Sequence, residues 1–188
     1  MASVDDLSTS FDESKPYARK VVELGEAMSN EHSALNSKIE DLTRGWLLRV
    51  PTKIMNLLSY NSDAQLPSPE KLMLRVDEYG NTTSRVVKSC IWMVTFGDRL
   101  RFLKEKQDIH MLFGALLDAR DSCSQIQSDI EELNGAANFY KKVAKIPKVK
   151  DAFSSVHDKF PVMLKAMEEL KPHLDVIVAK LDVALEIK

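Results

Sequence analysis

The chain has 188 residues, of which 44% are hydrophobic and 29% charged, with 26 lysines and arginines against 28 aspartates and glutamates. At this length a single core can bury about 70% of the surface that the unfolded chain exposes, so stability requires neither disulfides nor a structural metal. The net charge of -2 excludes the overall basic excess of a general nucleic-acid binder, and six glycines and seven prolines are too few for the tight turns of an all-β fold.

Residues 1–14 carry four acidic residues and no basic residue. They have neither the cationic start nor the apolar run of a secretory signal. We therefore interpret residues 1–14 as an acidic, flexible segment and residues 15–188 as a single helical domain of a cytoplasmic protein, with a position at a membrane surface left open. The nearly uncharged apolar run at 90–96 is far too short for a membrane-spanning helix.

The first predicted helix begins near Ser14 and Pro16, a capping residue followed by a proline suited to the first turn. Its apolar residues recur every three or four positions, with an interruption at 31–32. We expect Pro51 to end or kink this helix, and a short amphipathic piece to follow at 54–58.

A polar loop at 61–68, closed by prolines, precedes the second predicted helix at 69–100. Apolar residues at 86–96 cover nearly the whole circumference of this helix, so we expect it to be the central one. A strand is the alternative for the last part of that run, but no second strand lies within hairpin reach. Gly80 and Gly97 are candidate helix breaks.

The third predicted helix has the most regular pattern in the chain. From 109 to 140, apolar residues alternate spacings of three and four without a miss. The same pattern recurs at 149–184, where Pro161 and Pro172 interrupt it. We therefore predict a short helix to about residue 159 and a longer one from Pro161.

These segments define the fold class. Breaks at Pro51, Pro67, Pro69 and Pro147 divide the chain into rods of similar length joined by short connections, which makes successive rods antiparallel. The sequence predicts an all-α fold, an antiparallel up-and-down bundle of four to six helices, some of them long and kinked at prolines.

The sequence contains few candidates for catalytic residues. The sequence has no glycine-rich phosphate loop, no nucleophile elbow, no HExxH and no calcium-binding loop. Cys90 and Cys123 lack metal-site spacing and are expected to be free, buried thiols. We expect no catalytic residue, no metal and no cofactor; an enzyme whose site is assembled from dispersed residues is the remaining alternative.

Two basic stretches provide the candidate binding residues. The first is a lysine cluster without an acid, made of Lys141, Lys142, Lys145, Lys148 and Lys150. The second surrounds Phe102 and contains Arg99, Arg101, Lys104 and Lys106. Cations beside apolar side chains suit an anionic lipid surface or an acidic protein partner. A solvated turn with lysines near a helix C-terminus is the simpler interpretation of the first stretch.

These observations lead to two functional hypotheses. The first is a non-enzymatic module for protein–protein interaction or oligomerisation in cytoplasmic signalling or scaffolding, with the stripe at 109–140 as core or partner seam. The alternative is a membrane-active bundle that binds or permeabilises anionic lipid, as cell-death or toxin-like bundles do. No nucleic acid or metal is expected as a partner. An exposed apolar patch beside the lysine cluster would favour the membrane, and a separate patch would favour a protein partner.

Overall fold

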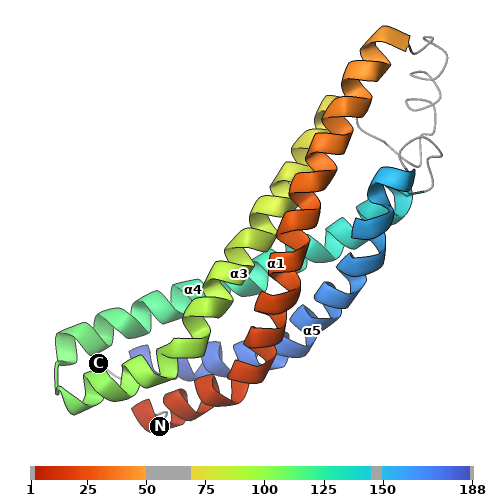
Figure 1. The fold of residues 1–188 in the computed structure, drawn as a ribbon. Helices are drawn as coiled ribbons and strands as arrows, with labels where there is room; N and C mark the ends of the chain where they lie inside the picture. Colours follow the sequence, from red (N-terminus) through yellow and green to blue (C-terminus); the bar gives the residue numbers. More distant parts are fainter. Residues whose placement is uncertain (1–2, 50–68, 145–149, 187–188) are drawn as a thin grey trace.

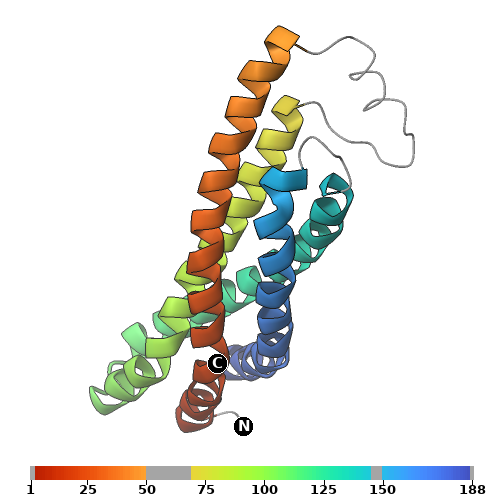
Figure 2. The same cartoon turned by 45° about the vertical axis from the view of Figure 1, so that its right-hand side comes forward.

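The computed structural model, which describes residues 3–49, 69–144 and 150–186, is a bundle of four long helices (Figure 1). The helices are α1 (Val4–Arg49), α3 (Pro69–Glu105), α4 (Ile109–Val143) and α5 (Lys150–Glu186). Successive helices run in opposite directions (Figures 1 and 2). The described residues contain no strand. The predicted all-α up-and-down bundle is confirmed, with a helix number inside the expected range.

Several sequence predictions concern residues outside the described part of the chain. They are the break at Pro51, the amphipathic piece at 54–58, the loop at 61–68 and the break at Pro147. Pro69 is the first residue of α3, in agreement with the predicted start of the second helix.

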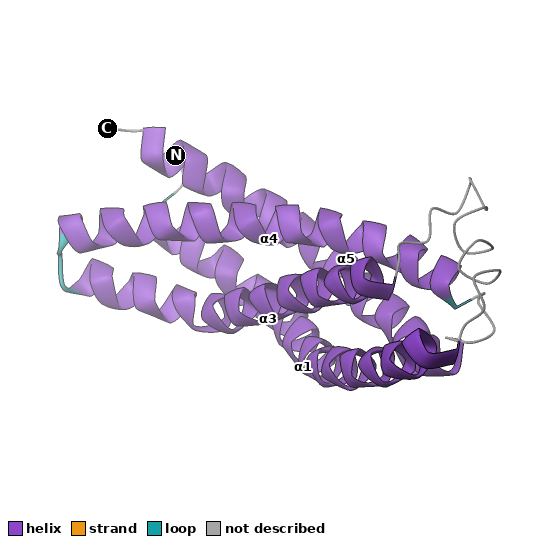
Figure 3. Cartoon of the chain, turned by 90° about the horizontal axis from the view of Figure 1, so that it is seen from above, coloured by secondary structure: helices purple, strands orange, loops and turns teal. Residues whose placement is uncertain are grey.

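Each helix packs against two neighbours. Helices α1 and α4 both lie against α3 and α5, so α1 and α4 face each other diagonally across the core (Figure 3). The regular stripe of α4 faces this core, and its buried members are Leu116, Ala119, Cys123, Ile126, Ile130, Leu133 and Tyr140. Each large apolar side chain buried in this way contributes about 1.5–3 kcal/mol. The stripe is therefore core rather than a partner seam over most of its length, although its first residue, Ile109, is exposed.

The structure corrects the expected start of the first helix. Helix α1 begins at Val4, so residues 4–14, which we expected to be flexible, are helical. A capping box starts the helix: the hydroxyl of Ser3 accepts the N–H of Asp6 at 3.1 Å, and the carboxylate of Asp6 accepts the N–H of Ser3 at 3.0 Å. Two N–H groups that the helix leaves unpaired are thereby satisfied, which stabilises this end by about 1 kcal/mol.

The early turns of α1 also belong to the hydrophobic core. Leu7 and Phe11 are fully buried. The ring of Phe11 contacts Phe96 edge-on at a centroid distance of 4.8 Å and Trp92 at 6.1 Å. The acidic N-terminal segment is thus part of the bundle rather than an appendage.

Prolines bend these helices without ending them. Pro16 lies inside α1, and Pro161 and Pro172 lie inside α5, so the predicted division of the last segment at Pro161 is wrong. The first turns of α1 and the last turns of α5 bend away from the axis of the upper bundle (Figures 1 and 2). A proline removes one helical N–H and displaces the preceding turn, which allows such a bend. The rings that follow two of these prolines, Tyr17 and His173, lie 4.3 Å apart between centroids and connect the two helices.

Two glycines expected to break the second helix instead lie inside α3. Helix α3 continues through Gly80 and Gly97. A Cβ atom on Gly80 would lie 3.4 Å from Cβ of His32, and one on Gly97 would lie 3.0 Å from Oδ1 of Asp12. Both glycines, like Gly25 of α1, lie where α1 and α3 approach closely. Their role is close helix packing rather than termination.

Candidate functional site

The lysine cluster lies where α4 ends and α5 begins. Lys141 and Lys142 are exposed in the last turn of α4, and Lys150 is the exposed first residue of α5. Lys145 and Lys148 lie outside the described residues. No ion pair involves the three described lysines within that part of the chain. Their ammonium groups are therefore free to meet an anionic group.

An open pocket with a volume of 670 Å³ adjoins this cluster. Its lining residues are Lys141, Ala144, Lys150, Ser154, His157 and Asp158. The carboxylate of Asp158 lies 3.3 Å from Nδ1 of His157. Together with Lys141 and Lys150, Asp158 gives the lining both signs of charge. Lysines at the end of α4 also stabilise the helix dipole by about 0.3–1 kcal/mol, which keeps the solvated-turn interpretation open.

The second basic stretch is partly neutralised by α1. The carboxylate of Asp12 pairs with the guanidinium of Arg101, whose other terminal nitrogen lies 2.9 Å from Asp98. Nζ of Lys104 lies 2.5 Å from the carboxylate of Asp5. The hydrogen bond from Arg101 lowers the pKa of Asp12, which favours the charged carboxylate. Part of the acidic N-terminal segment and part of the second basic stretch therefore neutralise each other within the molecule.

The other two residues of that stretch, Arg99 and Lys106, are exposed and have no ion pair in the described part of the chain. The ammonium group of Lys106 lies 5.4 Å from the centre of the Phe102 ring, which is a cation–π distance. Arg99 and Lys106 are the members of this stretch that a partner can reach without displacing α1.

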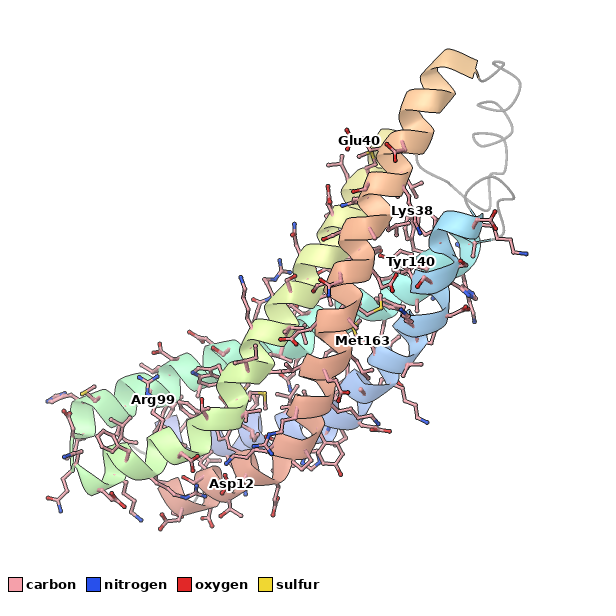
Figure 4. All side chains as sticks on the ribbon, viewed as in Figure 1. Asp12, Lys38, Glu40, Arg99, Tyr140 and Met163 are labelled. Carbon is pink, nitrogen blue, oxygen red and sulfur yellow. The ribbon has the colours of Figure 1, made fainter. Side chains whose placement is uncertain are left out.

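The two basic stretches lie at opposite ends of the bundle. Figure 4 places Arg99 near the end where α3 turns into α4, and Tyr140, which immediately precedes the lysine cluster, in the other half. Helix α4 connects the two ends with 35 residues, a length of about 50 Å. The structure therefore does not combine the predicted basic residues into one surface.

Three exposed apolar side chains lie at the α3–α4 end. Phe102, Ile109 and Met111 are 55%, 77% and 57% exposed. A sharp turn connects their two helices: Gln107 adopts a positive φ of 55°, and the carboxylate of Asp108 caps α4 by accepting the N–H of Met111 at 3.0 Å. The sequence pattern placed Ile109 in the core stripe, because spacing along a helix does not show where its neighbours end. We call these three residues the tip patch.

The sequence pattern also did not reveal a buried histidine in the core. His32 is 3% exposed. Its Nδ1 lies 2.8 Å from the carbonyl oxygen of Met28, and its Nε2 lies 2.7 Å from the hydroxyl of Tyr140. Burial lowers the pKa of His32. In the sequence it interrupts an apolar stripe, and its distant partner on α4 gives no local signal.

A further buried polar group joins α3 to α4. The carboxylate of Asp129 accepts hydrogen bonds from Nη2 of Arg85 at 3.1 Å and from the amide of Gln125 at 3.0 Å. Arg85 also donates to the hydroxyl of Thr82 at 3.1 Å, and its pairing with Asp129 raises its pKa. Because these groups satisfy one another, they connect two helices rather than offer a free proton acceptor.

The two cysteines are not activated as nucleophiles, and the described acids form no metal site. Cys90 and Cys123 are buried and free, as predicted, and burial raises the pKa of each thiol to about 12. Such thiols are protonated at neutral pH and are poor nucleophiles. Within residues 3–49, 69–144 and 150–186, no group of three or more histidine, cysteine or acidic side chains is arranged to hold a metal. None of the described helices has the length and apolarity required to cross a bilayer.

No family model matches the chain, and comparisons with curated proteins and with solved structures find no match.

Proposed function

We propose that this chain is a non-enzymatic helical-bundle module for protein–protein interaction or oligomerisation in cytoplasmic signalling or scaffolding. Its contact surface is the tip patch at the α3–α4 end. The occupant is a protein segment that offers apolar side chains flanked by carboxylates.

The observation that carries this proposal is the exposure of the tip patch. Exposed apolar side chains that occur singly are normal, but Phe102, Ile109 and Met111 lie close in sequence, on either side of the short connection between α3 and α4. A partner that covers an apolar side chain of this size gains up to about 1.5–3 kcal/mol from it. Arg99 and Lys106 add cations around the patch, which resembles the apolar centre and polar rim of protein interfaces.

The position of the lysine cluster supports a protein partner rather than a membrane. An apolar patch beside this cluster would suit a lipid surface, whereas the tip patch lies at the opposite end of α4. The tip patch is therefore too far from the lysine cluster for both to contact one membrane surface as a single site.

A double substitution in the tip patch tests the proposal. We expect Ile109→Asp with Met111→Asp to keep the fold, because both side chains are largely exposed, and to abolish a defined oligomer or partner complex. Light scattering over a concentration series measures self-association, and affinity capture from a cell lysate measures partner binding. Val176→Asp, which changes an exposed valine on α5, is the matched control and should bind like the wild type.

Two results would contradict the proposal. One is a strictly monomeric wild-type chain that captures no partner. The other is an oligomer or complex that survives the Ile109→Asp and Met111→Asp substitutions while circular dichroism shows an intact helical fold.

A membrane-active bundle is the second candidate, favoured by the cations beside the tip patch. Arg99 and Lys106 lie within a few residues of Phe102, and cations next to apolar side chains can bind an anionic lipid surface. The pairing of Asp5 and Asp12 with neighbouring cations weakens this candidate, because it removes positive charge from the same end.

A further inference from the structure

His32 links two helices that face each other diagonally. Helices α1 and α4 are each packed against α3 and α5. The side chain of His32, on α1, reaches across the core, and its Nε2 lies 2.7 Å from the hydroxyl of Tyr140 on α4. Both residues are almost completely buried, and Figure 4 shows Tyr140 in the part of the bundle between α1 and α5. This hydrogen bond is a direct polar link across the centre of the bundle.

The other ring nitrogen fixes the tautomer of the neutral imidazole. Nδ1 of His32 lies 2.8 Å from the carbonyl oxygen of Met28, which can only accept a hydrogen bond. Nδ1 therefore carries the hydrogen, Nε2 is the acceptor, and the hydroxyl of Tyr140 donates to it. Both ring nitrogens are satisfied when His32 is neutral.

A second proton on His32 disrupts this arrangement. Nε2 would then carry a hydrogen that points at the hydroxyl of Tyr140, which would have to turn its own hydrogen elsewhere. Aromatic rings surround the pair: Phe160 of α5 lies 6.5 Å from the imidazole, and Tyr79 of α3 lies 5.9 Å from the Tyr140 ring. A charged imidazolium in these surroundings costs free energy.

The charged groups near His32 do little to offset this cost. Glu31, the preceding residue of α1, favours the charged form of His32, but Lys159 of α5 pairs with Glu31. The group that α3 presents is Gly80, where a Cβ atom would lie 3.4 Å from Cβ of His32. Burial outweighs the effect of Glu31, so the pKa of His32 lies below its ordinary value.

We propose that the His32–Tyr140 hydrogen bond is an acid-sensitive latch, which holds α1 to α4 while His32 is neutral and releases them when His32 is protonated. The latch is independent of the tip patch, which lies at the other end of the bundle. Protonation would loosen the part of the bundle around His32 first, since that is where a charged imidazolium would lie buried among aromatic rings.

The direction of the pH dependence follows from the lowered pKa. Below the ordinary histidine value of 6.5, the unfolded chain binds a proton that the folded chain resists. The stability that neutral His32 contributes is therefore complete above about pH 6.5. It is lost as the pH falls from there towards the lower pKa that His32 has in the folded chain. One proton changes the unfolding equilibrium constant by at most about tenfold per pH unit.

Denaturant unfolding from about pH 7.5 to about pH 5.5 tests the latch, because the carboxylates titrate below this window. We expect the wild type to lose stability on acidification. His32→Gln should be less stable than the wild type at the higher pH and should lose the pH dependence that His32 causes. Tyr140→Phe, which keeps the ring but removes the donor, should also be less stable at the higher pH. His110→Gln, at an exposed histidine of α4, is the control and should follow the wild type.

The proposal is overturned if His32→Gln keeps the pH dependence of the wild type. If that variant does not fold, nitrogen-detected NMR of wild-type His32 decides instead. We expect the Nδ1–H tautomer and a titration below about pH 6.5. An Nε2–H tautomer, or a titration at or above that pH, would overturn the latch. Amide exchange near His32 and Tyr140, corrected for the intrinsic effect of pH, should accelerate on acidification.

Discussion

At the scale of single residues, Asp12 shows how one carboxylate connects two features that are far apart in the sequence. It pairs with Arg101 of α3 and lies 3.1 Å from the ammonium group of Lys15 on its own helix. Gly97 leaves space for it, since a Cβ atom there would lie 3.0 Å from Oδ1 of Asp12. Phe11, one residue earlier, packs on the same part of α3, so charge pairing and apolar burial hold the early turns of α1 together.

This pairing predicts a specific response to acid. We expect Asp12→Asn to lower stability near neutral pH, because Arg101 loses a charged partner. The folded-state pKa of Asp12 is depressed, so its contribution is complete above the ordinary value of 3.8 and is lost as the pH falls through the folded value. Urea unfolding should therefore separate wild type and variant at about pH 7, and the difference in stability between them should be smaller at about pH 3, below the ordinary value.

Asp121→Asn, at an exposed aspartate of α4, is the control for this experiment. It should resemble the wild type at both pH values. A gap between Asp12→Asn and the wild type that is equally large in acid would contradict the role of the charged pair.

The polar core shows what sequence reasoning could not find at this scale. His32 was visible only as an interruption of a stripe, and its hydrogen-bond partner, Tyr140, is more than a hundred residues away along the chain. Asp129 was similarly hidden between core residues of α4. A buried polar group is identified by the partner that satisfies it, and the fold alone determines that partner.

At the scale of elements, the close approach of α1 and α3 depends on glycine. A Cβ atom added to Gly25 of α1 would collide with Cγ2 of Val87 on α3. Valine is branched at Cβ and has little freedom to turn away. By contrast, a Cβ atom added to Gly135 of α4 would meet nothing within 4 Å.

These two glycines predict opposite effects of the same substitution. We expect Gly135→Ala to stabilise the protein by about 0.5–1 kcal/mol, because alanine favours the helix. Gly25→Ala should destabilise it by about 1–3 kcal/mol, because the collision with Val87 outweighs that gain. Thermal or urea unfolding measures both changes. Val87→Ala should partly rescue Gly25→Ala, and the absence of any rescue would argue against a direct collision.

The elements also show where local rules succeed and fail. Apolar spacing predicted the long helices, because a face buried along its whole length leaves a regular pattern. Proline and glycine rules failed inside helices: α1 contains Pro16, α5 contains Pro161, and α3 contains Gly80. Burial of the flanking side chains on neighbouring helices outweighs the local cost of these residues, and the sequence of one segment does not contain that information.

At the scale of the whole molecule, the near-neutral net charge conceals a different arrangement of charge at each end of the bundle. At the α3–α4 end, acids of α1 neutralise part of a basic stretch, whereas at the α4–α5 end the described lysines have no ion pair in that part of the chain. The sequence identified both basic stretches, but it could not show their separation or the pairing, because both depend on the direction in which the helices run.

Vesicle co-sedimentation tests the proposed function at this scale. We expect the chain to remain in the supernatant with phosphatidylcholine vesicles and with phosphatidylserine-containing vesicles at about 150 mM salt, where surface charges are largely screened beyond about 8 Å. Sedimentation with the anionic vesicles alone would support the membrane-active alternative. Reversal of Arg99 and Lys106 to glutamate would then locate the contact at the tip, and reversal of Lys141 and Lys150 would locate it at the opposite end.

The up-and-down topology also determines where a probe can be attached. Helix α1 starts and α5 finishes on the side of the bundle where α3 turns into α4 (Figures 1 and 3). An affinity tag or fluorescent protein fused to either terminus would therefore be attached at the same end of the bundle as the tip patch. A reporter coupled to an engineered cysteine at Lys142, at the far end of α4, keeps that surface clear and leaves the two buried native thiols untouched.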